Sequence, residues 1–135
     1  MLEWRALDWE RGGLATARDA LGAKRILGVS CYDDLGRAEA ALDAGADYIA
    51  VGSVFASASK PEATRASLAT LPEAKQRFKV PVVAIGGITA KNAPQVLAAG
   101  ADMVAVLSDL FNAMDIKSQA EKFRKLFINH KSRLS

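Results

Sequence analysis

The sequence predicts an α/β protein in which four parallel β-strands alternate with α-helices. Two observations carry this prediction. Four short apolar runs recur along the chain, and stretches with helical spacing of alanine, leucine and charged residues separate them. The runs are too uniformly apolar for strands with one face in water, and such runs are typical of parallel strands that are covered on both sides. Because right-handed crossovers join consecutive strands of this kind, the sheet is expected to be parallel throughout.

The elements follow in chain order. A short helix is expected over residues 14–21, and the first strand over "RILGVS" (25–30). The pattern "DLGRAEAALDAG" indicates the second helix, and "YIAV" the second strand. The later elements alternate in the same way: a helix in "TLPEAKQRF", a strand in "VPVVAIGG", a helix in "AKNAPQVLAAG", a strand in "MVAV" and a final helix in "SQAEKFRKLF".

An internal repeat supports this alternation. The segments "AGADYIAV" (44–51) and "AGADMVAV" (99–106) share Ala-Gly-Ala-Asp followed by an aliphatic run, and Asp47 and Asp102 lie 55 positions apart. The glycine of each copy follows a helical pattern and suits the left-handed position just after a helix. The chain is therefore expected to contain two copies of a larger unit.

Composition limits the classes of protein to which the chain can belong. It has 135 residues, of which 50% are hydrophobic, and this suits one globular domain. No apolar run approaches the ~18 residues of a membrane span, so we expect a cytoplasmic protein without a membrane partner. A single cysteine, Cys31, excludes an internal disulfide, and a packing role is favoured for it. The net charge is +3, and the densest basic cluster, in 117–133, is explained by a solvated helix rather than by a nucleic-acid partner.

Candidate binding residues follow the strands, since parallel βα units bind ligands at the carboxyl ends of their strands. Gly86 and Gly87 end the third apolar run. Because they lack Cβ atoms, their main-chain N–H groups are open to close approach by a phosphate group. The alternative is a tight turn into a helix that begins at Thr89, with Thr89 as its N-cap. The sequence leaves both interpretations open.

Two other strand ends add hydroxyl and amine groups. The segment "SASK" (57–60) follows the second strand and offers two hydroxyls and an amine to an anion. The alternative is a mobile polar loop. Ser108 follows the fourth strand, where its hydroxyl serves either the same anion or a plain N-cap.

Three longer motifs carry a resemblance to a known family. The segments "GVSCYDD", "GSVFASASKP" and "VPVVAIGGITAKNAPQVLAAGADMVAVLSDLF" resemble, in order and spacing, the second half of thiamine phosphate synthase, over about residues 14–127. The resemblance implies a parallel βα repeat that is the C-terminal half of a TIM (β/α)8 barrel. It also implies a transferase of thiamine biosynthesis that joins hydroxymethylpyrimidine diphosphate to a thiazole phosphate and releases pyrophosphate with magnesium. These two phosphorylated small molecules are the implied partners.

The resemblance also implies roles for residues at the strand ends. Ser30 matches the serine that contacts the pyrimidine diphosphate, and Lys60 matches a lysine on the diphosphate, so these two are the candidate catalytic residues. Seven residues match the family's thiazole phosphate site: Ser57, Ala58, Ser59, Gly86, Gly87, Leu107 and Ser108. No side-chain nucleophile is implied, because the family's chemistry needs charge stabilisation and alignment of the thiazole nitrogen.

The resemblance covers half of the family's barrel, since a (β/α)8 barrel usually has about 250 residues. The family's basic motif and its Asn-Asp pair belong to the first half, and Arg11 stands about where a second metal-binding aspartate falls. Magnesium is therefore implied by the family, but its ligands are not expected in this chain. We divide the chain into an atypical N-terminal segment (1–13), a half-barrel domain (14–129) and a basic C-terminal tail (130–135).

Three interpretations of function remain open. The first is a thiamine phosphate synthase-like chain that is inactive or weakly active alone. The second is a relative of the thiazole tautomerase, for which Cys31 or Tyr32 stands nearest the place where a catalytic histidine is expected. The third is a half-barrel module that binds phosphate without chemistry.

A half-barrel is also expected to associate. Both outer strand edges would be unpaired, and the strand faces that fill a barrel interior would be exposed to water. We therefore expect a homo-oligomer, a dimer whose two copies complete eight strands. Alternatively, the N-terminal segment with Trp4 and Trp9 covers the open face.

Overall fold

The computed structural model describes residues 13–56 and 65–134 of the chain. Helices and strands alternate in this part, as the sequence predicts. In chain order the elements are α1 (Gly13–Leu21), β1 (Gly28–Tyr32), α2 (Leu35–Asp43), β2 (Tyr48–Val51), α3 (Thr70–Arg77), β3 (Val82–Ala84), α4 (Ala93–Ala98), β4 (Met103–Val104), α5 (Ser108–Phe111) and α6 (Ile116–Leu134).

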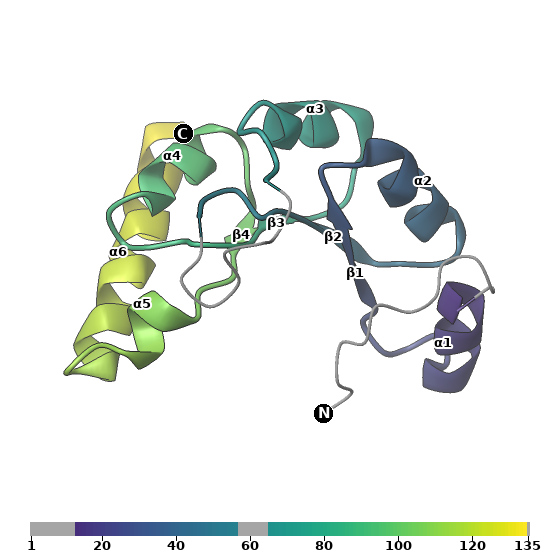
Figure 1. Ribbon diagram of the computed structural model, residues 1–135, viewed down its shortest axis with the longest axis horizontal. Coiled ribbons are helices and arrows are strands. Elements are labelled where there is room, and N and C mark those ends of the chain that lie inside the picture. The colour runs from purple at the N-terminus through teal and green to yellow at the C-terminus, as the bar shows by residue number, and fades with distance from the viewer. Residues whose placement is uncertain (1–12, 57–64, 135) are drawn as a thin grey trace.

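The four strands form one sheet in the order β1-β2-β3-β4, and each neighbouring pair is parallel. This confirms the predicted α/β class and the parallel sheet. Figure 1 shows the sheet as part of an arch, with α2, α3 and α4 on its outer, convex side. Helix α1 lies at the β1 end of the arch, and α5 and α6 lie at the β4 end. An arch of parallel strands under a layer of helices is the shape of a segment of a (β/α) barrel.

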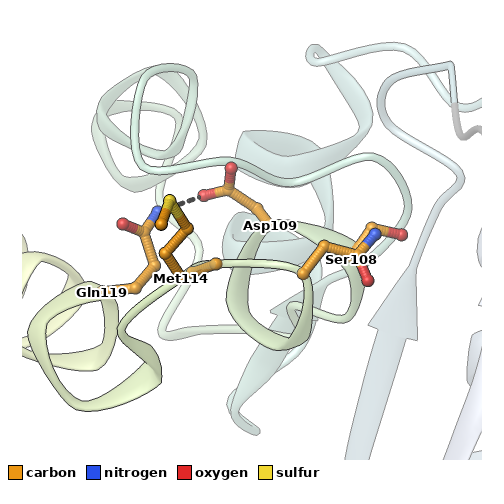
Figure 2. Close-up of a pocket in the computed structure, with 6 residues that line it drawn as sticks. Ser108, Asp109, Met114 and Gln119 are labelled. Atoms are coloured by element: carbon orange, nitrogen blue, oxygen red, sulfur yellow. Dashed lines mark hydrogen bonds between the residues drawn. The ribbon is translucent and has the colours of Figure 1, made fainter.

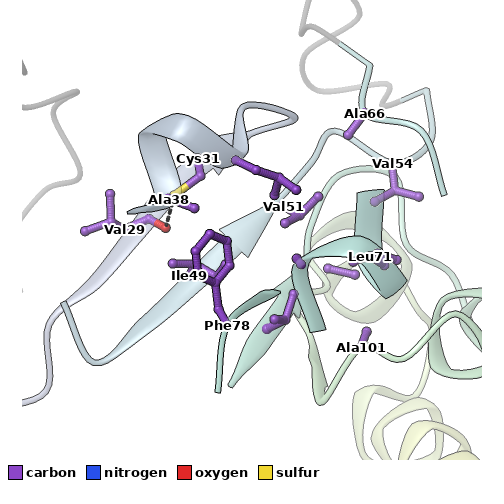
Figure 3. Close-up of a cluster of buried hydrophobic side chains, with 14 of the residues drawn as sticks. Val29, Cys31, Ala38, Ile49, Val51, Val54, Ala66, Leu71, Phe78 and Ala101 are labelled. Carbon is purple, nitrogen blue, oxygen red and sulfur yellow. Dashed lines mark hydrogen bonds between the residues drawn. The ribbon is translucent and has the colours of Figure 1, made fainter. Parts of the chain in front are cut away.

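The hydrophobic core lies between the sheet and the helices of the convex side (Figure 3). Ile49 of β2 and Val82 of β3 are partners in the sheet, and both side chains are fully buried. Leu71 of α3 and Val96 of α4 are fully buried in the same cluster. Successive side chains of a strand point to opposite faces, so the alternate residues of β2 and β3 face the concave side of the arch.

The concave face carries a row of residues that the strand register places side by side: Ser30, Ala50, Val83 and Met103. The expectation that this face is exposed is wrong for the middle strands, because Ala50 and Val83 are only 6% and 8% exposed. Side chains on the inside of a curved sheet converge and shield one another. Met103 lies on the edge strand and is 40% exposed, because β4 has a neighbouring strand on one side only.

The first strand begins later than the sequence predicts. It starts at Gly28 rather than Arg25, and Ile26 is 77% exposed. The N–H group of Leu27 donates to the Asp47 carboxylate at 2.7 Å rather than to a neighbouring strand. A side chain therefore decides where β1 starts.

The two copies of the internal repeat end their helices in the same way. Gly45 and Gly100 have φ values of 99° and 106°, in the left-handed region that favours glycine. In each copy the next residue donates to a carbonyl oxygen five positions back, at 3.0 and 3.1 Å. This is the hydrogen-bond pattern of a Schellman motif, so the predicted glycine helix ends are confirmed.

The aspartates of the repeat also make equivalent contacts. Asp47 accepts a hydrogen bond from the N–H group of Leu27 at 2.7 Å, and Asp102 accepts one from that of Val82 at 2.8 Å. Each aspartate precedes a strand and binds the start of the strand before it. The sequence repeat is therefore a structural repeat, and each copy ties one pair of neighbouring strands together.

Helix α6 is the longest element. It runs over 19 residues, so most of the segment 130–135 is helical. Its lysines and arginines are exposed, which agrees with a solvated helix as the explanation of the basic cluster. None of the helices that the structure describes combines the length and the apolar character needed to cross a membrane.

Candidate phosphate-binding site

The site residues expected from the sequence fall into three groups. Four lie outside the residues that the structure describes: Ser57, Ala58, Ser59 and Lys60. Four follow the neighbouring strands β3 and β4: Gly86, Gly87, Leu107 and Ser108. Ser30 lies in β1, at the opposite edge of the sheet, with β2 and β3 between it and β4.

Two consecutive glycines turn the chain after β3. Gly86 and Gly87 have φ values of 93° and 64°, which side chains with a Cβ atom rarely adopt. A Cβ atom at Gly86 would lie 2.1 Å from the hydroxyl oxygen of Ser53, and one at Gly87 would lie 2.5 Å from the carbonyl oxygen of Ala56. Close packing against the segment after β2 therefore requires both glycines, whether or not a ligand binds.

Hydrogen bonds hold the segment after β2 against this turn. The N–H group of Val54 donates to the carbonyl oxygen of Ile85 at 2.9 Å, and that of Phe55 donates to the carbonyl oxygen of Gly86 at 3.1 Å. These bonds extend the contact between β2 and β3 beyond the ends of the two strands. The described part of the second strand end, up to Ala56, is thus fixed beside the glycine turn.

The main-chain N–H groups of this turn remain available. Among the described residues, none accepts a hydrogen bond from the N–H groups of Gly86 or Gly87. Consecutive N–H groups in left-handed or turn conformations form a concave surface that attracts anions. The packing therefore establishes the tight-turn interpretation. The N–H groups of the turn are also compatible with the phosphate interpretation.

The turn is braced by a second turn that the sequence reading missed. The N–H group of Thr89 donates to the side-chain oxygen of Asn92 at 2.8 Å, and the N–H group of Asn92 donates to the Thr89 hydroxyl at 3.1 Å. The Asn92 amide also donates to the carbonyl oxygen of Gly87 at 2.9 Å. Helix α4 consequently begins at Ala93 and not at Thr89. The signal was the Thr-x-x-Asn spacing, which resembles a capping box.

Asp109 joins the two strand-end loops. Its carboxylate accepts hydrogen bonds from the N–H group of Ala90 and from the Gln119 side chain, both at 2.8 Å. Figure 2 shows the Gln119 amide pointing toward Asp109, with Met114 beside them and Ser108 on the other side of Asp109. The loop after β4 is therefore tied to the loop after β3. The sequence analysis assigned no role to Asp109.

A pocket of about 350 Å³ opens beside this contact. Six residues line it: Ser108, Asp109, Asn112, Ala113, Met114 and Gln119. Ser108 is the first residue of α5, after the N-cap Leu107, and its hydroxyl has no hydrogen-bond partner among the described residues. Leu107 is 63% exposed, with its side chain largely in solvent. The Ser108 hydroxyl is thus free to serve a ligand at the ends of β3 and β4.

Ser30 lies apart from this group, on a distorted edge strand. It is half-buried and pairs with Ala50, and the strand register shifts between Ser30 and Tyr32. Tyr32 has a φ value of 56°, unusual for a residue with a large side chain. Arg37 lies 5.4 Å above its ring, in a cation–π arrangement. The strand end that carries Ser30 is therefore held in a specific, strained shape.

Cys31 points away from the site. Its side chain is fully buried in the cluster on the convex side of the sheet (Figure 3). Burial raises the pKa of the Cys31 thiol to about 12. The predicted packing role is confirmed, and a thiol with this pKa is a poor acid–base group at neutral pH.

The described residues do not form a site that suits magnesium. No group of three or more histidine, cysteine, aspartate or glutamate residues lies together in 13–56 and 65–134. Two carboxylates at the strand ends already have partners: Asp34 caps α2 by accepting from the N–H group of Arg37 at 3.0 Å, and Asp109 holds two loops together. Mg²⁺ requires several oxygen ligands in near-octahedral geometry. The magnesium that the resemblance implies therefore finds no site among the described residues.

A parallel βα arch whose helices cover one face of the sheet defines the class of (β/α) barrel segments. The family model described as thiamine monophosphate synthase matches residues 8–110. The chain belongs to the thiamine monophosphate synthase family.

Individual relatives agree with this assignment. The chain is 51% identical over 121 residues to the thiamine-phosphate synthase of Nitrosococcus oceani, covering 90% of this chain and 56% of that protein. It is 52% identical over 118 residues to the thiamine-phosphate synthase of Aromatoleum aromaticum, covering 87% and 57%. The solved thiamine phosphate pyrophosphorylase from Pyrococcus furiosus superposes with a TM-score of 0.77 and 36% identity, covering 87% of this chain and 55% of that one. The chain thus spans about half the length of these relatives.

Proposed function

We propose that this chain provides the thiazole-phosphate side of a thiamine phosphate synthase site. In the proposed reaction a bond forms between the thiazole nitrogen and the methylene carbon of the pyrimidine, and the bond from that carbon to the diphosphate oxygen breaks. Pyrophosphate leaves with the electron pair of that bond. The observation that carries the proposal is the glycine turn after β3, whose N–H groups are open in a chain about half identical to synthases.

The role proposed for this turn is orientation. The N–H groups of Gly86 and Gly87 and the hydroxyl of Ser108 would hold the phosphate of the thiazole, and Asn92 and Asp109 would keep the two loops rigid. A phosphate fixed at one end places the ring nitrogen at a constant distance from the reacting carbon, and such positioning lowers the activation barrier. The residues 57–59 belong to the same proposed site, and Lys60 and Ser30 are proposed for the diphosphate.

We further propose that the chain binds the thiazole phosphate but makes thiamine phosphate only at background rate when alone. The described residues lack a magnesium site, and no step of this proposal passes through the metal. Without enough positive charge on the diphosphate, its departure is slow. We take residues 14–129 as the half-barrel domain and place the protein in the cytoplasm.

A phosphate-binding module without chemistry is the second candidate. The tautomerase alternative has less support, because one of its two candidate acid–base groups, Cys31, faces the core and its pKa is raised to about 12 by burial. Binding without turnover would fit both the half-site synthase and the module.

Calorimetric titration of thiazole phosphate into the purified chain tests the binding step. We expect the Ser108→Ala variant to bind about tenfold more weakly, because a hydrogen bond to a charged group contributes about 1.5 kcal/mol. Ser118→Ala, a hydroxyl on the exposed face of α6, is the matched control and should bind as the unaltered chain does. Equal affinity for the thiazole alcohol without its phosphate would contradict the proposed site.

Formation of thiamine phosphate from both substrates, with magnesium present, tests the catalytic half of the proposal. We expect no product above the rate measured without protein. Sustained turnover that is lost in Lys60→Ala would show that the chain alone is a complete catalyst. That result would overturn the half-site proposal.

A further inference from the structure

We propose that two copies of this chain join edge to edge and close an eight-stranded parallel barrel, in which β4 of each copy pairs with β1 of the other. The inference rests on the sheet and its exposed residues. It holds whether or not the glycine turn binds phosphate.

The large exposed apolar side chains of the described residues lie at the two ends of the arch. In the described part of the chain, the large apolar side chains that are exposed lie in only two stretches, 26–32 and 103–128: Ile26, Tyr32, Met103, Leu107, Phe111, Met114, Ile116 and Ile128. The middle of the arch, from α2 to α4, has none among its described residues. Exposed apolar side chains gathered at two edges, beside a well-buried centre, mark surfaces that a partner covers.

The two edges have complementary backbones. Among the described residues β1 pairs only with β2 and β4 only with β3, so each presents one side that no described strand pairs with. Unpaired strand edges recruit further strands. Because all four strands are parallel, β4 and the β1 strand of a second copy run in the same direction when the copies are related by a two-fold axis along the strands.

The internal repeat shows that the curvature suits closure. The first copy of the repeat ties β1 to β2, and the second ties β3 to β4. The two copies have equivalent helix ends and equivalent aspartate contacts. The operation that carries one two-stranded unit onto the next is therefore a rotation around the axis of the arch. In a barrel of eight strands two strands fill a quarter of the circle, so two further applications of the same rotation complete it. Those two units are a second copy of this chain.

Closure would also complete a site. Within one chain Ser30 and Ser108 lie at opposite edges of the sheet, separated by β2 and β3. In the proposed dimer the strand end that carries Ser108 adjoins the strand end that carries Ser30 in the second copy. The dimer therefore brings together two groups that a single arch keeps apart.

Light scattering and hydrogen exchange on the full chain test the proposal. We expect a mass of twice 14.3 kDa at micromolar concentration. On dilution to monomer, we expect amide exchange in 28–32 and 103–106 to accelerate at least tenfold. A monomer at all concentrations would overturn the proposal. So would a dimer whose exchange in these two stretches does not depend on concentration.

Substitution separates this seam from other surfaces. Met103→Lys places a charge on the β4 edge and should raise the dimer dissociation constant at least tenfold, since lysine on an edge strand opposes pairing. Gln76→Lys adds the same charge on the exposed convex side and should leave the dimer intact. If Met103→Lys lowers helix content in circular dichroism, Ala105→Lys, at an exposed position after β4, replaces it. A dimer unaffected by the edge lysine, or a chain that pairs only with a different protein, would overturn the proposal.

Discussion

In both halves of the arch an aspartate accepts a hydrogen bond from a main-chain N–H group, but a different cation pairs with the aspartate in each half. In the first half Asp47 is bonded by Arg18 at 2.6 Å, and in the second half Asp102 is bonded by Lys75 at 2.8 Å. The Arg18 side chain is 18% exposed and that of Lys75 is 34% exposed. The repeat therefore keeps the aspartate and its main-chain partner, while the position, type and burial of the cation differ.

The difference lies in how much each cation connects. Besides the Asp47 carboxylate, the Arg18 guanidinium donates to the carbonyl oxygens of Gly22, Arg25 and Gly45 at 2.6–3.0 Å. It thereby joins the end of α1, the approach to β1 and the end of α2. Among the described residues, Lys75 donates to Asp102. Arginine has five donors in a planar fork, whereas lysine is a compact point charge, so Arg18 joins more of the described segments than Lys75 does.

Substitution of the two cations should give the largest difference in stability between the two halves of the arch. We expect Arg18→Ala to lower the free energy of unfolding by about 2 kcal/mol, because the part-buried carbonyl oxygen of Gly45 and the exposed carbonyl oxygens of Gly22 and Arg25 lose charged donors. Lys75→Ala should lower it by about 0.5 kcal/mol, as for an exposed ion pair. Urea denaturation followed by circular dichroism measures both. Equal losses would show that the additional bonds of Arg18 contribute nothing.

Substitution of the two aspartates should give a smaller difference in stability between the halves, and this difference should depend on pH. The pKa of Asp47 is lowered from its ordinary value of 3.8, first by the hydrogen bond from the Leu27 N–H group and then by the bond from Arg18. The folded state therefore favours the carboxylate, and this contribution is present above about pH 4 and is lost as the pH falls through the folded pKa.

Thermal unfolding between pH 2 and pH 7 measures this effect. We expect the melting temperature of Asp47→Asn to fall less steeply below pH 4 than that of the unaltered chain. Asp102→Asn, measured at pH 7, gives the corresponding change in the second half of the arch. We expect this substitution to destabilise the protein less than Asp47→Asn does, because Lys75 makes fewer hydrogen bonds to the described residues than Arg18 does. A reversed order at pH 7 would contradict the comparison.

Substitution of the two glycines of the repeat should give the smallest difference in stability between the halves. Gly45→Ala and Gly100→Ala should each destabilise by about 1 kcal/mol, because both positions have positive φ. The added Cβ atom would lie 3.3 Å from the Arg18 side chain in one case and 3.3 Å from the Lys75 side chain in the other. Arg18 is held by its hydrogen bonds and yields less, so Gly45→Ala should cost a few tenths of a kcal/mol more.

The same measurement in the Arg18→Ala background checks this explanation. Without the guanidinium, the two alanine substitutions should become equal within error. If Gly45→Ala still destabilises more than Gly100→Ala in this background, the difference arises from the backbone and not from the Arg18 side chain.

Sequence reasoning succeeded at the strand ends and failed where partners are distant in the chain. Gly86, Gly87 and Ser108 were identified as strand-end residues because glycines and serines punctuate apolar runs locally. The contact of Gly86 with Ser53, and that of Asp109 with Ala90, join positions 33 and 19 residues apart. No local pattern encodes such pairs, so the contact of Asp109 with Ala90 was not anticipated, whereas the turn formed by Asn92 has a local signal in its Thr-x-x-Asn spacing.

By itself the sequence determined the alternation of strands and helices, the parallel sheet, the two repeat copies and the family. It did so because hydrophobic periodicity, glycine helix ends and motif spacing are properties of neighbouring residues. Only the tertiary structure decided that Cys31 faces the core, that Ala50 and Val83 are covered, and that Arg18 rather than another cation binds Asp47. These outcomes depend on the curvature of the sheet and on which side chains it brings within hydrogen-bond distance, and both arise only when distant segments pack together.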